Sequence, residues 1–264
     1  MNAHTSDGTM FDVHAEQDNP CVVLIHGLGL NQDVWRWQLD ALKPHYCVLT
    51  YDLYGHGNSA NPTAIPSLSL FSEQLAGVMD HCGVRDAAII GFSLGGMIAR
   101  RFAQDMPERV TALGILNSPH KRTPEAQAAI LKRVEQAREE GTGATVEAAL
   151  ERWFTAPFRA ANPDMMALVR TWVLANDKAV YHTIYQVLAD GIDEIVAPNP
   201  PISCPSFVLT GDEDYGNGPE MSAAIAADIA GAECCILKGL RHMALAENPA
   251  AVNVPLLAFL KRTL

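Results

Sequence analysis

Gly91-Phe92-Ser93-Leu94-Gly95-Gly96 is the stretch from which the fold of this chain can be predicted. An apolar run, Ala87-Ala88-Ile89-Ile90, precedes it, and a helix-like run at residues 97–103 follows it. The pattern G-x-S-x-G between a strand and a helix is typical of a nucleophile elbow, a tight turn that lifts a serine hydroxyl above the edge of a sheet. The alternative is an ordinary glycine-rich turn with a surface serine. Catalytic partners for Ser93 elsewhere in the chain would favour the elbow.

Strands and helices alternate on both sides of this turn. Continuous apolar runs, typical of strands buried on both faces of a parallel sheet, occur at residues 21–25, 47–51, 87–90, 110–116, 206–210 and 234–237. Apolar residues at helical spacing occur at 31–42, 68–82, 219–229 and 249–260. Asp7-Gly8 predicts a turn between two short strands within the first twenty residues. The whole predicts an α/β fold with a mostly parallel central sheet and helices on both faces.

The alternation stops between Pro119 and Pro200, where the pattern is helical throughout. Thr123-Pro124-Glu125 predicts a helix start, as do Asn162-Pro163-Asp164 and Asp177. The block is rich in apolar periodicity and poor in Gly and Ser, which argues against a linker. We therefore expect an inserted helical cap, or lid, at residues 119–198, and a core formed by residues 1–118 and 199–264.

The composition indicates which partners to expect. The chain has 264 residues, of which 48% are hydrophobic and 19% charged, as in soluble globular proteins. Its net charge of −11 argues against nucleic acid and against an anionic membrane, because both require clustered Lys and Arg. Residues 1–7 lack a signal-peptide pattern, and no apolar run is long enough to span a membrane. Six cysteines occur without a C-x-x-C pair, so we expect reduced thiols and a cytoplasmic location. We expect the protein to be a monomer or a homodimer.

Catalytic partners for Ser93 are found after the last two predicted strands. A serine hydroxyl needs a base within hydrogen-bond reach, and the base needs an acid that orients it. His242 follows the last strand and Asp214 the one before, so both are expected at the sheet edge that carries Ser93. His120, just past a strand end, is the rival base, and Asp212 is the rival acid. Asp214 is preferred because it lies farther past its strand.

Backbone groups complete the predicted site. A tetrahedral intermediate needs two N–H donors beside its oxyanion. Leu94 supplies one directly after the serine, and Leu28, in the loop after the first long apolar run, is the candidate for the other. His26 and His56 lie in glycine-rich loops, where hydrogen bonds to backbone are expected. No H-E-x-x-H motif and no Cys/His cluster occurs, so the sequence indicates neither a metal nor a cofactor.

Five motifs are shared with a known superfamily. They are His26-Gly27-Leu28-Gly29, Asp52-x-x-Gly55-His56-Gly57-x-Ser59, Gly91-Phe92-Ser93-Leu94-Gly95-Gly96, Gly211-Asp212-Glu213-Asp214 and Arg241-His242. With them the chain resembles the α/β-hydrolase superfamily over nearly its whole length. The resemblance implies the α/β-hydrolase fold and supports Asp214, since the second acid of such a G-D-x-D turn is usually catalytic there. Serine at position 93 disfavours the haloalkane dehalogenase and epoxide hydrolase branches, which use aspartate.

A narrower resemblance comes from the helical block. Leu150-Glu151-Arg152-Trp153-Phe154-Thr155-Ala156-Pro157-Phe158-Arg159 and Ala175-Asn176-Asp177 are similar to lid segments of β-ketoadipate enol-lactonases, which open a lactone bearing a carboxylate. The resemblance implies that Trp153 lines the pocket; the alternative is a helix-packing aromatic. A carboxylate requires a cation, and His120, Lys121 and Arg122 at the entry to the lid are the candidates; the alternative is a solvated basic turn.

These features predict a cofactor-free serine hydrolase that cleaves a small carboxylic ester or lactone through an acyl-enzyme. The partner is then a small molecule, with no nucleic acid and no membrane involved. A C–C bond hydrolase, a perhydrolase or an acyltransferase with the same triad are the alternative enzymes. A non-catalytic ligand-binding protein that kept the fold and the pocket is the alternative from another class.

Overall fold

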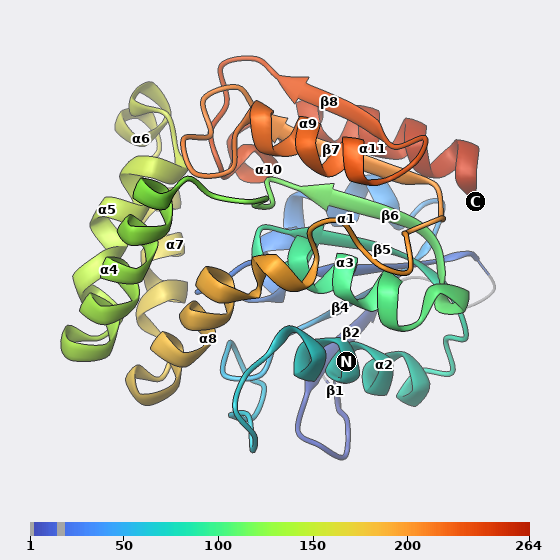
Figure 1. Cartoon of the computed structure of the whole chain (residues 1–264), viewed down its shortest axis with the longest axis horizontal. Helices are drawn as coiled ribbons and strands as arrows, with labels where there is room; N and C mark the ends of the chain where they lie inside the picture. Colours follow the sequence, from blue (N-terminus) through green and yellow to red (C-terminus); the bar gives the residue numbers. More distant parts are fainter. Residues whose placement is uncertain (1–2, 15–18) are drawn as a thin grey trace.

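The structure, a computed structural model, describes residues 3–14 and 19–264 (Figure 1). Residues 1–2 of the N-terminal segment and residues 15–18 of the first predicted strand pair lie outside the described residues. In the described part, eight strands form one sheet in the order β1-β2-β4-β3-β5-β6-β7-β8. Their bounds are Ala3–His4 (β1), Met10–His14 (β2), Cys21–Ile25 (β3), Cys47–Tyr51 (β4), Ala87–Phe92 (β5), Val110–Leu116 (β6), Ser206–Gly211 (β7) and Glu233–Leu237 (β8).

The sheet is mostly parallel, as the sequence predicts. Strands β3 to β8 pair in parallel, and β1 and β2 add an antiparallel edge. The predicted turn between β1 and β2 is present, and it requires glycine because Gly8 has a φ of 82°. Parallel pairing brings the carboxyl ends of β5, β6, β7 and β8 to one edge, where the loops that carry chemistry begin.

Helices cover both faces of the sheet and explain the continuous apolar runs. In β3, Val22 and Leu24 pack in the cluster that contains Leu42 and Phe259, on α1 and α11. The alternate residues of β3 pack in a second cluster, with side chains of α2, α3 and α9. Both faces of β3 are thus buried, as in a sheet with helices on each side. The helices of the core are η1 (Gln32–Trp35), α1 (Arg36–Leu42), α2 (Leu68–His81), α3 (Leu94–Asp105), η2 (Pro107–Arg109), α9 (Pro219–Asp228), α10 (Ala244–Glu247) and α11 (Pro249–Thr263).

A block of helices stands between β6 and β7. It comprises α4 (Pro124–Glu140), α5 (Gly143–Trp153), α6 (Ala156–Ala161), α7 (Pro163–Leu174), α8 (Lys178–Asp190) and η3 (Gly191–Glu194). Figure 1 shows α4 to α7 stacked at the left of the view, beside the carboxyl end of β6. The helix starts predicted at Thr123 and Asp177 are confirmed, since both side chains accept a hydrogen bond from the first turn of their helix. The short helix α6 was not predicted.

Two observations bear on the expectations about thiols and membranes. All six cysteines are free. Within residues 3–14 and 19–264, no helix combines the length and the apolar character that crossing a bilayer requires.

Candidate active site

Ser93 lies in a sharp turn between β5 and α3, with backbone angles of φ 56° and ψ −114°. A positive φ costs a non-glycine residue conformational energy and persists only where its surroundings hold it. Here the Ser93 N–H donates to the Leu116 carbonyl (2.8 Å), and the Ser118 hydroxyl donates to the Ser93 carbonyl (2.9 Å). A Cβ on Gly91 would lie 2.1 Å from the Gly95 carbonyl oxygen, so the turn needs glycine before the serine. The structure thus has the strained strand-turn-helix geometry that the sequence predicts.

Two backbone N–H groups that the sequence analysis singled out, those of Leu28 and Leu94, belong to segments next to Ser93. A Cβ on Gly27 would lie 3.1 Å from the Ser93 Cβ, so the loop that carries Leu28 is packed directly against the serine. Leu94 is the first residue of α3, and its N–H therefore has no partner inside the helix. Two such N–H groups beside a nucleophile can stabilise negative charge on an oxygen bound there.

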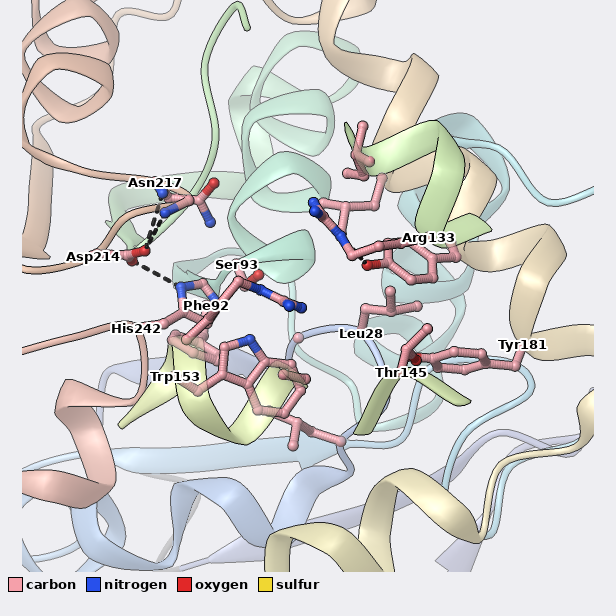
Figure 2. A pocket seen from close by; sticks show the side chains of 18 of the residues that line it. Leu28, Phe92, Ser93, Arg133, Thr145, Trp153, Tyr181, Asp214, Asn217 and His242 are labelled. Atoms are coloured by element: carbon pink, nitrogen blue, oxygen red, sulfur yellow. Dashed lines mark hydrogen bonds and ion pairs between the residues drawn. The ribbon is translucent and has the colours of Figure 1, made fainter. Parts of the chain in front are cut away.

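His242 and Asp214 are hydrogen-bonded to each other beside Ser93. The His242 Nδ1 lies 2.8 Å from Asp214 Oδ2. Asn117 Nδ2 donates to the same carboxylate oxygen (3.0 Å), and the Gly216 and Asn217 N–H groups donate to Oδ1 (3.1 and 3.0 Å). Figure 2 shows Asp214 between His242 and Asn217, with the interactions drawn as dashed lines. The carboxylate is therefore held on both oxygens and is pointed at the imidazole.

The environment of Asp214 keeps the carboxyl group ionised. Burial alone would raise its pKa, but His242 and the hydrogen bonds from Asn117 and the Asn217 backbone outweigh burial, and the net result is a lowered pKa. The rival acid, Asp212, accepts a hydrogen bond from the Gly239 N–H (2.7 Å) and pairs with a lysine, away from the imidazole. Of the two candidate acids, the structure thus places Asp214 against His242.

A cavity of about 100 Å³ connects these residues. Its described lining includes Ser93, Asp214, His242 and Leu28 together with Arg122 and Trp153. The other lining residues are Gly27, Leu30, Phe92, Ile130, Arg133, Thr145, Ala149, Arg152, Tyr181, Tyr185, Leu188, Gly216 and Asn217. Within the described ranges, no three His, Cys, Asp or Glu side chains are grouped so as to hold a metal ion.

Trp153 lies over the imidazole at the edge of the cavity. Its ring centroid is 6.1 Å from that of His242, and the two rings are inclined by 31°. The Met243 N–H donates to the Trp153 carbonyl (2.9 Å), which fixes the end of α5 against the loop that carries the histidine. Figure 2 shows Trp153 on the same side of the pocket as His242, and both residues line the cavity together with Ser93. The structure thus places Trp153 in the pocket that the resemblance implies for it.

The three basic candidates at the start of the helical block have different positions. Arg122 lines the cavity, but His120 and Lys121 are absent from its described lining. The His120 Nε2 lies 3.0 Å from Asp228 Oδ2, and this pairing to α9 holds the ring away from Ser93. Lys121 is exposed to solvent. Of the three candidates for substrate binding, the structure places only Arg122 in the described lining of the cavity.

Two arginines and two asparagines of the site were missed by the sequence analysis. Arg133 on α4 and Arg152 on α5 both line the cavity. Asn117 follows β6 with a positive φ of 48°, and its carbonyl accepts a hydrogen bond from Asn217 Nδ2 (2.8 Å). The position of Asn117 in the sequence could have identified it as a site residue. It is a polar residue directly after a buried strand, at the edge of the sheet where Asp214 and His242 were expected.

Two buried histidines hold the loop that carries Leu28. The His26 Nε2 accepts the Leu53 N–H (2.9 Å), and the His56 Nε2 accepts the Gly29 N–H (2.9 Å). A ring nitrogen that accepts a hydrogen bond carries no proton, so both imidazoles are neutral. Burial lowers the pKa of His26 to about 3 and the pKa of His56 to about 4, from an ordinary value of 6.5. As the sequence analysis expected, both histidines bond to backbone.

These two histidines predict a loss of stability in mild acid. Between pH 6.5 and about pH 4 the unfolded chain binds protons at both histidines and the folded chain does not, so stability falls as pH falls through this window. The expected slope is about 1.4 kcal/mol per pH unit for each histidine. Urea unfolding between pH 7.5 and pH 4.5 measures it. His56→Gln should reduce the slope and His45→Gln, at an exposed position, should not; an unchanged slope in His56→Gln would contradict the assignment.

Comparison with known proteins is in accord with this architecture. The chain is similar to an (E)-2-((N-methylformamido)methylene)succinate hydrolase of Acinetobacter baylyi, with 28% identity over 92% of this chain and 90% of the relative. It is also similar to 3-oxoadipate enol-lactonase 2 of that organism, with 26% identity over 94% of this chain and 91% of the relative. Among solved structures, the enol-lactonase from Burkholderia xenovorans LB400 superposes with a TM-score of 0.90 and 27% identity, over 99% of this chain and 100% of that one. Residues 20–249 match the family model described as alpha/beta hydrolase fold, and the chain therefore belongs to that family.

Proposed function

We propose that this protein is a serine hydrolase that cleaves a small carboxylic ester or lactone through an acyl-enzyme. The observation that carries the proposal is the shared cavity: Ser93, in its strained turn, lines the same cavity as a His242 that is hydrogen-bonded to Asp214. This is the combination of nucleophile, base and orienting acid that acyl transfer needs. The names of two similar proteins, both enol-lactonases, support a lactone or ester as the substrate.

The proposed chemistry has two half-reactions. The Ser93 hydroxyl oxygen attacks the carbonyl carbon while His242 Nε2 takes its proton, and the Leu28 and Leu94 N–H groups hold the resulting oxyanion. His242 then gives the proton to the leaving alkoxide, the C–O bond breaks, and Ser93 carries the acyl group. Water, deprotonated by the same imidazole, attacks the acyl carbon. The bond between this carbon and the Ser93 oxygen then breaks, His242 returns the proton to the serine, and the carboxylic acid is released. Asp214 stabilises the imidazolium in both steps and stays ionised.

The substrate of this proposal carries a carboxylate. Arg122 lines the cavity and is fixed there by donating to the Ala189 and Leu188 carbonyls (3.2 and 3.0 Å). Trp153 supplies an apolar wall next to the imidazole. A guanidinium on one side and an aromatic face on the other suit a short acyl chain that ends in a charged group.

A panel of substrates tests this proposal. It contains p-nitrophenyl acetate, a simple lactone, a matched amide and a β-diketone, each assayed alone, with hydrogen peroxide and with an alcohol. We expect turnover of the ester and the lactone, with the free carboxylic acid as the main product in every condition. A peracid or a transferred ester as the main product would support perhydrolysis or acyl transfer instead. Cleavage of the diketone alone would point to a C–C bond hydrolase, and turnover of none of these would favour a binding protein.

A further inference from the structure

Three guanidinium groups line the cavity of Ser93. Arg122 precedes α4, Arg133 lies on α4, and Arg152 lies near the end of α5, so all three come from the helical block rather than from the sheet. All three side chains are half-buried. Figure 2 shows Arg133 on one side of the cavity, with Asp214 and His242 on the other and Ser93 between them.

The charge of these groups is not balanced inside the cavity. Asp214 is the sole acid in the described lining, and its carboxylate is already taken by His242. The acids that act on the arginines from a distance are Asp190 and Glu151, and both are exposed and outside the lining. The cavity thus holds three positive charges with no anion of the described chain bound among them.

The arginines also repel one another. Burial, followed by the charge of Arg133, lowers the pKa of Arg122 to about 10. The same two causes lower the pKa of Arg152. Repulsion of this kind disfavours the empty site and is relieved when an anion binds between the groups.

Each arginine keeps donors for a ligand. The Arg133 Nε donates to the Tyr185 hydroxyl (3.0 Å), and its two terminal nitrogens have no hydrogen-bond partner among residues 3–14 and 19–264. Arg152 makes no hydrogen bond or ion pair with any residue in the described part of the chain. Arg122 is held by the backbone carbonyls at the end of α8, so its position is fixed before a ligand arrives. A fixed set of unused donors is what preorganised anion binding requires.

We propose that Arg122, Arg133 and Arg152 form a site for a dianion, and that the substrate is a small ester or lactone bearing two carboxylates. One carboxylate would neutralise one of the three guanidinium groups, whereas two carboxylates use the bidentate geometry of two arginines and the charge of the third. The inference rests on the proposed function for its ester or lactone bond, but the dianion site stands on the arginines alone. Aliphatic and aromatic lining from Leu30, Phe92 and Trp153 favours a short carbon chain over an inorganic ion.

Binding of product-like acids to the wild-type chain tests the site. Isothermal titration compares succinate with butyrate, and glutarate with valerate, which match in chain length and differ in one carboxylate; inorganic phosphate is the third arm. We expect the dicarboxylates to bind at least about tenfold more tightly than their monocarboxylate partners. Equal affinities within each pair would overturn the proposal, and so would phosphate binding more tightly than either dicarboxylate.

Charge-neutralising variants test whether the arginines of the cavity are the groups that bind the dicarboxylates. Arg133→Gln and Arg152→Gln should each weaken succinate binding by about tenfold or more. Lys132→Gln, next to Arg133 but exposed, and Lys121→Gln, next to Arg122 but exposed, remove the same charge outside the cavity and should leave binding unchanged. Equal losses in the lysine variants would show a general charge effect and overturn the site. Should a glutamine variant not fold, Arg133→Lys keeps the charge and is expected to lose part of the affinity.

The two proposals fail in different measurements. The acids are not hydrolysed, so their binding does not depend on the reactivity of Ser93. If the protein does not hydrolyse esters but still binds dicarboxylates more tightly than monocarboxylates, the proposed serine hydrolase activity is contradicted and the proposed dianion site is supported. If the protein hydrolyses esters but binds both kinds of acid equally, the dianion site is contradicted and the serine hydrolase activity is supported.

Discussion

Replacing Ser93 by alanine is expected to lower kcat for p-nitrophenyl acetate by about 10⁴-fold or more, to the level that binding and the oxyanion donors alone sustain. The reason is that the acyl-enzyme cannot form without the hydroxyl, and no other serine or cysteine is in the described lining of the cavity. The folded state should not suffer, because the small side chain adds little to the packing of the turn. Steady-state kinetics over a range of ester concentrations gives kcat and KM for both proteins.

The matched control is Ser69→Ala, which makes the same change on α2, outside the cavity lining. It should retain wild-type kcat and KM. If Ser93→Ala kept more than about a tenth of the wild-type kcat, turnover would have to arise from another group, and the assignment of the nucleophile would be wrong.

Asp214→Asn should lower kcat by about 10³- to 10⁴-fold, the second largest effect. A neutral amide cannot stabilise the imidazolium that forms when His242 accepts the proton. Its NH₂ group would also face donors, because Asn117 Nδ2 and the Gly216 and Asn217 N–H groups all point at the present carboxylate. The asparagine would therefore interact poorly both with His242 and with the N–H donors that now hold Asp214. We expect KM to change little.

Asp212→Asn provides the comparison, since it makes the same substitution two residues earlier in the same turn. Asp212 accepts from Gly239 and pairs with Lys238, on the outside of the turn. Its kcat should stay within about threefold of wild type. If Asp212→Asn lowered kcat as much as Asp214→Asn does, the loss would come from disturbing the turn and not from removing the Asp214 carboxylate.

Much of the core fold could be predicted because its strands are buried on both faces. An apolar run such as Cys21–Ile25 is buried from Val22 to Ile25, so no polar residue interrupts it, and its short length distinguishes it from a helix. The short helix α6 escaped prediction because six residues beginning with Ala156 and Pro157 show less than two turns of periodicity. Helix α10, four residues long, is too short for any periodic signal.

The site was predictable where topology dictates it. Ser93, Asp214 and His242 follow three parallel strands, and the parallel sheet carries all three strand ends to one edge. Asp214 was preferred over Asp212 because it lies farther past its strand, and it is the acid that the structure places against His242. The distances across that edge depend on turn geometry, which the sequence does not give. The similarity at Asn176 has a structural counterpart: the Asn176 Nδ2 donates to the Gly29 carbonyl (3.0 Å) and so connects the helical block to the loop that carries Leu28.

Arg122 was a candidate from the sequence, but Arg133 and Arg152 could not be assigned from it. A charged residue on an amphipathic helix is usually solvated. The sequence around Arg133 does not show whether its side of the helix faces solvent or a cavity. His120 was misplaced for a related reason: its partner, Asp228, is 108 residues away, and no local pattern reveals the pairing. The substrate selection that we propose depends on how the helical block folds onto the sheet, and residue spacing along the sequence does not predict that packing.

The most direct test of the catalytic assignment is mass spectrometry after incubation with a fluorophosphonate. These reagents phosphonylate a serine that is activated by a neighbouring base and stabilised by an oxyanion hole. We expect one adduct on the intact protein, located on Ser93 by peptide mapping and absent from both Ser93→Ala and heat-unfolded protein. No adduct, or an adduct on a residue other than Ser93, would contradict the proposal that Ser93 is the nucleophile of a serine hydrolase.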